Sequence, residues 1–339
     1  MKNNTLNKIF KTVAFLICAI TVFSVCTMVY QRKTYEGIWN YMGKLEEFYG
    51  MEENSLDYVT VGSSHAYCSV NPLEVWNSSE ISGFVLATQQ QPLRASYHYI
   101  KEVFKTQSPK YIILEGYMSF YRDEFSEGIL YDAVDPLKTS VNKFEMINAL
   151  VKPEDRLNYY FNIFKYHSRW KEVTFEEAET AFIRTGDVYK GYVALQRYFT
   201  GNNLIPDYDS VNADVLPAHN LETLNDILQL TQENGAELIL ILGPYNGSGK
   251  SFVAIFKGLK NWAEENNVEF IDYSLLLGEL GIDPNVDYYD AEHLNASGAA
   301  KISAHLGQYL KEKGLTANPN ADAEQWQADY DAFKEKFPA

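Results

Sequence analysis

Asp57-Tyr-Val-Thr-Val-Gly-Ser-Ser-His65 is the stretch from which the fold of this chain can be read. Its β-branched and aromatic residues from Tyr58 to Val61 are typical of a short buried strand. Gly62 follows, and glycine tolerates the backbone angles that a sharp turn can require. Ser63, Ser64 and His65 therefore come directly after a strand, where open α/β sheets place their ligands.

Further along the chain, strands and helices alternate on both sides of a central interruption. Short apolar runs predict four more strands, at Phe84–Leu86, Tyr111–Leu114, Leu238–Leu242 and Val268–Ile271. Apolar spacing and terminal signals predict helices at Pro92–Thr106, His219–Asn234, Ser251–Asn266 and across Ala299–Leu310. Such alternation predicts an α/β domain whose parallel sheet is connected by right-handed crossovers.

The alternation stops between Tyr117 and Val215, in a stretch rich in Tyr and Phe. Irregular helical segments are predicted there, for example at Arg156–Lys171 and Phe175–Ile183. The stretch can be an insertion that forms a lid or partner surface over the strand ends, or a helical subdomain with its own core. In both cases its aromatic residues are numerous enough to line a groove.

The N-terminal region contains an uncharged, largely apolar run from Val13 to Tyr30. This run is long enough to span a bilayer, which takes about 17–25 helical residues. The short basic tail in front of it favours a cytoplasmic N-terminus and an extracellular main domain. A cleaved signal peptide is the alternative, but no Ala-x-Ala site is found and the run is longer than a usual signal core. We therefore predict an uncleaved, single-pass anchor in the cell membrane.

On this interpretation the chain divides into four segments. They are a cytoplasmic tail with the transmembrane anchor (1–33), a juxtamembrane linker helix (34–54), the main domain (55–314, with the helical insertion at 117–215) and a C-terminal helix (315–339). The polar linker helix, within Gln31–Glu53, is expected to lift the domain off the membrane. Aromatic residues at helical spacing in the tail are expected to pack back on the domain: Trp326, Tyr330, Phe333 and Phe337.

The composition excludes several classes of function. A net charge of −16 over 339 residues argues against nucleic-acid binding, because no excess of cations is present to neutralise phosphates. Of three cysteines, Cys18 and Cys26 fall in the apolar segment and only Cys68 lies in the main domain, so a disulfide framework is excluded. We find no zinc-ligand spacing and no phosphate-binding glycine loop, and we predict neither a metal nor a cofactor.

A second motif, Asp290-Ala-Glu-His293-Leu-Asn295, supplies partners for a strand-end serine. An Asp three residues before a His can reach back to the imidazole and select its tautomer. Ser64, His293 and Asp290 therefore have the chemistry of a nucleophile, a base and an orienting group. Further candidates for the oxyanion or substrate contacts are Gln91, Asn246, Ser63 and His65. For Gln91 and Asn246, a role as turn-stabilising amides is an equal alternative, and His65 is expected to pack beside the turn.

Gly62-Ser63-Ser64 resembles the first sequence block of the SGNH (GDSL) hydrolases, and Asp290-Ala-Glu-His293 resembles their last block. The Gly-Ser-Ser variant behind an N-terminal anchor most resembles the DltD-like branch. The resemblance implies a three-layer flavodoxin-like fold with Ser64 as the nucleophile. The middle of the chain departs from the family pattern. Gly243-Pro-Tyr-Asn246 is the nearest counterpart of the Gly-x-Asn-Asp block, and Ala87-Thr-Gln-Gln-Gln91-Pro92 replaces the second-block glycine.

These observations predict a bacterial, cell-surface serine acyl esterase or O-acyltransferase. The resemblance implies an envelope polysaccharide or teichoic-acid-like polymer as substrate, with a membrane-bound O-acyltransferase as a possible supplier of the acyl group. The alternative is a non-catalytic, membrane-tethered binding subunit of an acyl-transfer complex. The degenerate middle blocks favour that alternative, whereas the retained triad residues argue against it.

Overall fold

The five strands form one parallel sheet in a computed structural model that describes residues 2–31, 40–121, 124–182, 189–201, 205–245 and 250–338. The strand order is β2-β1-β3-β4-β5, and each predicted strand lies within two residues of an observed one. The strands are β1 (Tyr58–Gly62), β2 (Gly83–Ala87), β3 (Tyr111–Glu115), β4 (Glu237–Leu242) and β5 (Glu269–Asp272). The order is that of a flavodoxin-like sheet, which confirms the predicted fold class.

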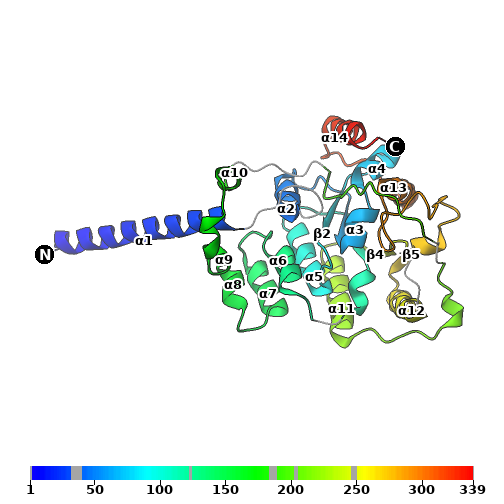
Figure 1. Cartoon of the computed structure of the whole chain (residues 1–339), viewed down its shortest axis with the longest axis horizontal. Helices are drawn as coiled ribbons and strands as arrows, with labels where there is room; N and C mark the ends of the chain where they lie inside the picture. Colours follow the sequence, from blue (N-terminus) through cyan, green and yellow to red (C-terminus); the bar gives the residue numbers. More distant parts are fainter. Residues whose placement is uncertain are drawn as a thin grey trace.

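Helices cover both faces of the sheet, as expected when right-handed connections run in two directions (Figure 1). From β1 the chain moves outward to β2, and from β2 it returns past β1 to β3, β4 and β5 in turn. One face is covered by α3 (Ser64–Ser69), α4 (Pro72–Ser79) and α13 (Ala296–Glu312). The other face is covered by α5 (Leu93–Val103), α11 (Ala218–Glu233) and α12 (Lys250–Glu265). The result is a three-layer arrangement in which the strand order reverses at β1.

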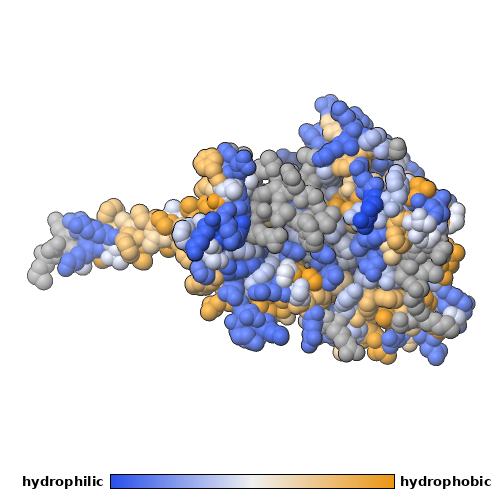
Figure 2. All heavy atoms as spheres, in the orientation of Figure 1, coloured by the Kyte–Doolittle hydropathy of each residue, from blue (hydrophilic) through white to orange (hydrophobic). Residues whose placement is uncertain are grey.

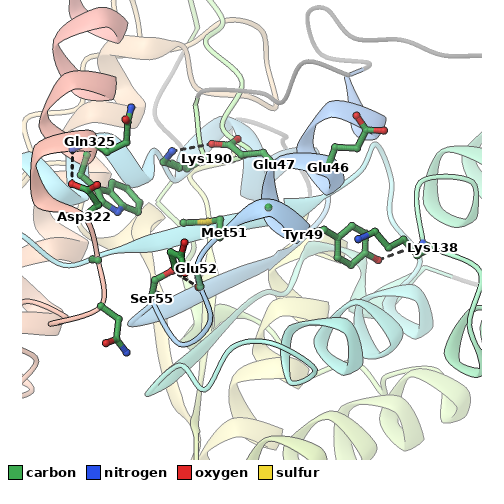
Figure 3. Close-up of a pocket in the computed structure, with 14 residues that line it drawn as sticks. Glu46, Glu47, Tyr49, Met51, Glu52, Ser55, Lys138, Lys190, Asp322 and Gln325 are labelled. Carbon is green, nitrogen blue, oxygen red and sulfur yellow. Dashed lines mark hydrogen bonds and ion pairs between the residues drawn. The ribbon is translucent and has the colours of Figure 1, made fainter. Parts of the chain in front are cut away.

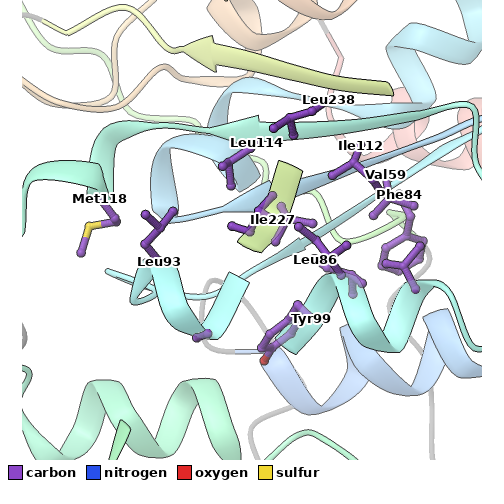
Figure 4. Packing of buried hydrophobic residues seen from close by; sticks show 14 of the residues in the cluster. Val59, Phe84, Leu86, Leu93, Tyr99, Ile112, Leu114, Met118, Ile227 and Leu238 are labelled. Atoms are coloured by element: carbon purple, nitrogen blue, oxygen red, sulfur yellow. The ribbon is translucent and has the colours of Figure 1, made fainter. Parts of the chain in front are cut away.

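The core follows from the alternation of side chains along these apolar strands. Val59, Ile112 and Leu238 point towards α5 and α11, together with Tyr99 and Ile227 from those helices (Figure 4). The intervening strand residues join a second cluster, against α3, α4 and α13. Side chains on both faces of the sheet are therefore buried against helices.

The insertion extends the α5 layer and has no separate core among the residues described. It contains α6 (Glu127–Val134), α7 (Val141–Leu150), α8 (Arg156–Tyr160), α9 (Asn162–Tyr166), the 3-10 helix His167–Lys171 and α10 (Phe175–Glu179). Met146, Ile147 and Tyr159 of this region are buried in the same cluster as the sheet residues. Helix α7 packs against α5, so the helical part of the insertion lies beside the sheet.

The remaining helices are α1 and α2 near the N-terminus and α14 near the C-terminus. Helix α1 (Lys2–Tyr30) is apolar and long enough to cross a membrane over Thr5–Tyr30. The linker expectation for Gln31–Glu53 needs correction, because α2 (Tyr41–Gly50) buries Leu45 and Phe48 in the main core and belongs to the domain. Residues 32–39 lie outside the described ranges. Helix α14 (Ala323–Lys336) packs back as expected, with Trp326 stacked on Trp76 at 5.3 Å.

Candidate active site

The turn between β1 and α3 presents Ser64 at the carboxyl edge of the sheet. Ser63 caps α3, and its Oγ accepts the N–H of His65 at 3.3 Å, as short polar residues at helix N-termini commonly do. A Cβ atom on Gly62 would lie 2.6 Å from the Cβ of Glu115, so this close approach to β3 requires glycine. Ser64 is the first residue of the helix and is 8% exposed.

The loop before α13 delivers the other two groups to Ser64. The Nε2 atom of His293 lies 2.8 Å from the Oγ of Ser64, across 229 positions of sequence. On the other side of the ring, Nδ1 lies 3.0 and 3.1 Å from the two carboxylate oxygens of Asp290. Asp290 also accepts the backbone N–H groups of Glu292 and His293, each at 2.8 Å. The carboxylate therefore shapes the loop and orients the imidazole at the same time.

The electrostatics of Asp290 suit an orienting carboxylate. Burial raises the pKa of Asp290, but hydrogen bonds from the His293 ring and the Glu292 N–H outweigh burial, and the net pKa lies below its ordinary value. The carboxylate stays charged at neutral pH and accepts a proton-bearing Nδ1. Nε2 is then the ring nitrogen that can accept the hydroxyl proton of Ser64.

The loop is held in place by α13 and by the returning end of the insertion. Asn295 caps α13 by accepting the N–H groups of Ser297 and Gly298, at 3.0 and 3.2 Å. The N–H of Ala296 donates to the Leu195 carbonyl at 2.8 Å, and the N–H of Phe199 donates to the Tyr288 carbonyl at 3.0 Å. The returning segment 189–201 thus contributes to the position of His293.

Sequence reasoning missed Glu115, the last residue of β3. Its Oε2 accepts the Ser63 hydroxyl at 2.7 Å and the Ser63 N–H at 3.3 Å, while its Oε1 accepts the Tyr117 N–H at 2.6 Å. Burial raises the pKa of Glu115 to about 7, although the bonds from Ser63 and Tyr117 act in the opposite direction. The carboxyl joins the ends of β1 and β3 through Ser63, the residue before Ser64. An acidic residue that ends an apolar strand before Gly116 was the available signal.

His65 lies behind the proposed base and is buried. Its ring stacks on Tyr117 at 4.0 Å and on His293 at 4.9 Å. Burial and then the neighbouring His293 lower the pKa of His65 well below its usual value, so this ring stays neutral. This geometry agrees with packing beside the turn and makes His65 a support for the His293 ring.

Further aromatic rings contact Tyr117 and one another. Tyr245, which follows β4, lies 5.6 Å from Tyr117 and 5.0 Å from Phe252. Phe120 lies 5.5 Å from Phe252. Tyr245, Phe252 and Phe120 are only half-buried. They form an aromatic wall next to His65.

The other candidates lie in different settings. Gln91 is fully buried in the β2–α5 turn, where its Nε2 donates to Ser96 at 2.9 Å and its Oε1 accepts from Thr88 at 3.2 Å. Both ends of its amide are thus engaged in stabilising the turn. Asn246 lies outside the described residues. Within the described ranges, no group of three or more His, Cys, Asp and Glu residues is arranged to hold a metal ion.

A cavity of about 620 Å³ lies elsewhere, between α2 and α14 (Figure 3). Its lining includes Lys190, whose Nζ lies 2.9 Å from Glu47 and 2.6 Å from Asp329. These ion pairs connect α2, the returning segment and α14. Ser64, His293 and Asp290 do not line this cavity.

No family model matches the chain, and no curated protein matches it. Among solved structures, a "putative acylhydrolase" from Bacteroides fragilis is similar over 83% of this chain and 99% of its own, with 13% identity and a TM-score of 0.39. A "putative lipolytic protein of G-D-S-L family" from Desulfitobacterium hafniense is similar over 75% of this chain and 99% of its own, with 12% identity and a TM-score of 0.38. An acetyl xylan esterase from Butyrivibrio proteoclasticus covers 77% and 64%, with 10% identity and a TM-score of 0.33. The function proposed below therefore rests on the residues of this chain.

Proposed function

We propose that this protein is a membrane-anchored serine esterase or O-acyltransferase that acts on an acylated polymer of the cell envelope. The observation that carries the proposal is the hydrogen-bonded line from Ser64 through His293 to Asp290. A serine that packs only for stability does not need a histidine at 2.8 Å with a carboxylate behind it. These three groups in this order supply nucleophilic acyl transfer.

In the first half-reaction, the Ser64 Oγ attacks the carbonyl carbon of an ester or thioester. As the new C–O bond forms, Nε2 of His293 takes the hydroxyl proton and the carbonyl π electrons move to oxygen. Asp290 stabilises the imidazolium, and the backbone N–H of Ser64 is the proposed donor to the oxyanion. The tetrahedral species then expels the leaving alcohol or thiol, which takes the proton from Nε2, and an acyl-serine remains.

In the second half-reaction, an acceptor hydroxyl gives its proton to Nε2 and attacks the acyl-serine. Breaking the ester bond to Ser64 restores the serine hydroxyl with the proton from His293. Water as acceptor gives hydrolysis, and a sugar or polyol hydroxyl gives transfer. The aromatic wall beside His65 offers flat apolar surfaces that suit an acyl group or the face of a sugar ring.

Helix α1 supports the membrane location in this proposal, since Thr5–Tyr30 has the length and apolarity of a span. With its basic N-terminal tail in the cytoplasm, the domain lies outside the cell beside the envelope polymers. A membrane-bound O-acyltransferase that delivers acyl groups across the bilayer is a suitable donor partner for such a site.

The proposal is tested by reacting the detergent-solubilised full chain with a fluorophosphonate probe and mapping the labelled peptide by mass spectrometry. We expect one modified residue, Ser64, and no label in Ser64→Ala. Ser63→Ala is the adjacent control, and it should keep the label at a reduced rate because only the cap and the Glu115 contact are lost. Label that survives in Ser64→Ala but is lost in Ser63→Ala would assign the nucleophile to Ser63. A folded wild-type chain that takes no label would support the binding-subunit alternative.

A further inference from the structure

Helix α1 has no spare turn with which to hold the domain away from a bilayer. Its uncharged stretch, residues 12–30, follows Lys11 and ends with the helix at Tyr30. At about 1.5 Å per residue this stretch is about 29 Å long, which only just matches the ~30 Å thickness of a bilayer hydrocarbon core. If α1 spans the membrane, its final turns must lie in the outer leaflet.

Those final turns are packed against the insertion. The ring of Phe23 contacts Phe161 edge-on at 6.2 Å, and the guanidinium of Arg169 donates to the Tyr30 carbonyl at 2.8 Å. Helix α1 also contacts α9, the 3-10 helix His167–Lys171 and α10 (Figure 1). Phe23 lies about 10 Å along the helix axis before Tyr30, so its partner Phe161 reaches the depth of the outer leaflet.

The same part of the insertion exposes large apolar side chains. We call the following set the α9–α10 patch: Phe161 (45% exposed), Phe164 (54%), Trp170 (62%), Phe175 (85%) and Phe182 (62%). Figure 2 shows hydrophobic surface along α1 and again where α1 meets the insertion. Aromatic side chains, Trp above all, are favoured at the boundary between hydrocarbon and headgroups.

We propose that the α9–α10 patch inserts into the outer leaflet around α1, so that the domain lies on the membrane surface. This inference rests on the membrane anchor proposed above and is independent of the catalytic assignment. The occupant of the patch is a zwitterionic lipid surface, because the charges nearby are mixed and partly paired. Arg169 is paired with Glu177, and Lys165 with Asp135 at 3.1 Å. Apolar burial therefore dominates over attraction to anionic lipid.

The orientation has a consequence for the site. Contact at α1 and at the patch holds the domain by two separate attachments, which restricts its rotation about the anchor. The strand ends that carry Ser64 then keep a constant height above the bilayer, as suits a donor presented by a membrane partner. A domain on a free tether would sample many heights.

The test uses the full chain reconstituted in phosphatidylcholine vesicles, with an environment-sensitive fluorophore on a single thiol. In a background with Cys18→Ser and Cys26→Ser, where Cys68 is buried, the label is placed at Phe164→Cys, at Phe175→Cys or at Leu275→Cys. Leu275 is the matched control, since it is 47% exposed and belongs to the 3-10 helix Tyr273–Leu275. This helix directly follows β5, and β5 lies on the side of the domain opposite α1 in Figure 1. A fourth protein keeps Cys18 alone and reports on α1. Doxyl-labelled phosphatidylcholine serves as the quencher.

We expect the doxyl lipid to quench the labels at 164 and 175 at least about twice as strongly as the label at 275, and to quench Cys18 as well. Equal, weak quenching at 164, 175 and 275 with strong quenching at Cys18 would overturn the inference while leaving the anchor intact. Absence of quenching at Cys18 would overturn both. Cooperative thermal unfolding of the same preparations, followed by circular dichroism, shows that they are folded and does not depend on the catalytic proposal.

Discussion

At the scale of single residues, Ser64, His293 and Asp290 are expected to act as one unit, so losses from their removal should overlap. His293→Ala should cost about as much activity as Ser64→Ala, because an unassisted hydroxyl is a poor nucleophile at neutral pH. Asp290→Asn should cost less, since the base remains. The double variant His293→Ala with Asp290→Asn should be little worse than His293→Ala alone. The measurement is kcat/KM on an aryl ester.

Multiplicative losses in that cycle would show that Asp290 and His293 act independently, and the triad assignment would fail.

The neighbouring histidine provides a control. His65→Phe keeps the ring stack on Tyr117 and His293 and should retain most activity, because His65 is buried and neutral. His65→Ala removes the support and should lower kcat more than it changes KM.

Glu115 predicts a pH-dependent stability. Burial raises its pKa from 4.5 to about 7, so between these values the folded state binds more protons than the unfolded state. The contribution of Glu115 to the free energy of unfolding is thus fully present below pH 4.5 and is lost as the pH rises through 7. The loss is on the order of 3 kcal/mol. Glu115→Gln reproduces the protonated carboxyl and should remove this dependence.

The measurement is urea denaturation of wild type and Glu115→Gln at pH values from 4.5 to 8, which gives the difference between their unfolding free energies at each pH. The difference should change in favour of the variant as the pH rises. Glu154→Gln, at an exposed position, is the control and should show no such trend. A constant difference across the range would mean that Glu115 is not the titrating group.

At the scale of elements, the β1–α3 turn depends on how closely β3 approaches it. A methyl group on Gly62 would meet the Cβ of Glu115 at 2.6 Å and that of Ala66 at 3.1 Å. Gly62→Ala should therefore lower the unfolding free energy by about 1–3 kcal/mol and slow fluorophosphonate labelling, because Ser64 moves with the turn. Gly50→Ala is the matched control, since a Cβ there has no neighbour within 4 Å. Equal unfolding midpoints for both variants would contradict the close approach.

For the full chain, the proposed membrane location depends on α1. The full chain should stay in the membrane fraction after carbonate washing, and protease should reach the main domain only from outside the cell. The physical reason is the uncharged stretch of α1, which has the length of one span. A soluble mature chain that begins beyond residue 26 would show that the segment is a cleaved signal.

Features that depend on local pattern can be predicted from the amino-acid sequence alone. Apolar runs such as Leu238–Leu242 specify buried parallel strands, because a strand covered on both faces needs apolar residues throughout. The same holds for the uncharged Val13–Tyr30 segment and for the Asp290 and His293 pair, whose hydrogen bond lies within one loop. These features need few long-range contacts to be recognised.

Features that depend on long-range packing are visible only in the folded chain. In the sequence, Glu115 is recognisable only as the end of a strand. In the fold, β1 and β3 are neighbours at the point where the strand order reverses, and the Glu115 carboxyl accepts hydrogen bonds from Ser63 and Tyr117 there. The insertion was ambiguous because its aromatic residues are compatible with a lid, a separate core or an added layer, and the choice depends on contacts with α5. Ser64 and His293 are 229 positions apart in the sequence, and no local pattern predicts their contact. The parallel sheet brings them together.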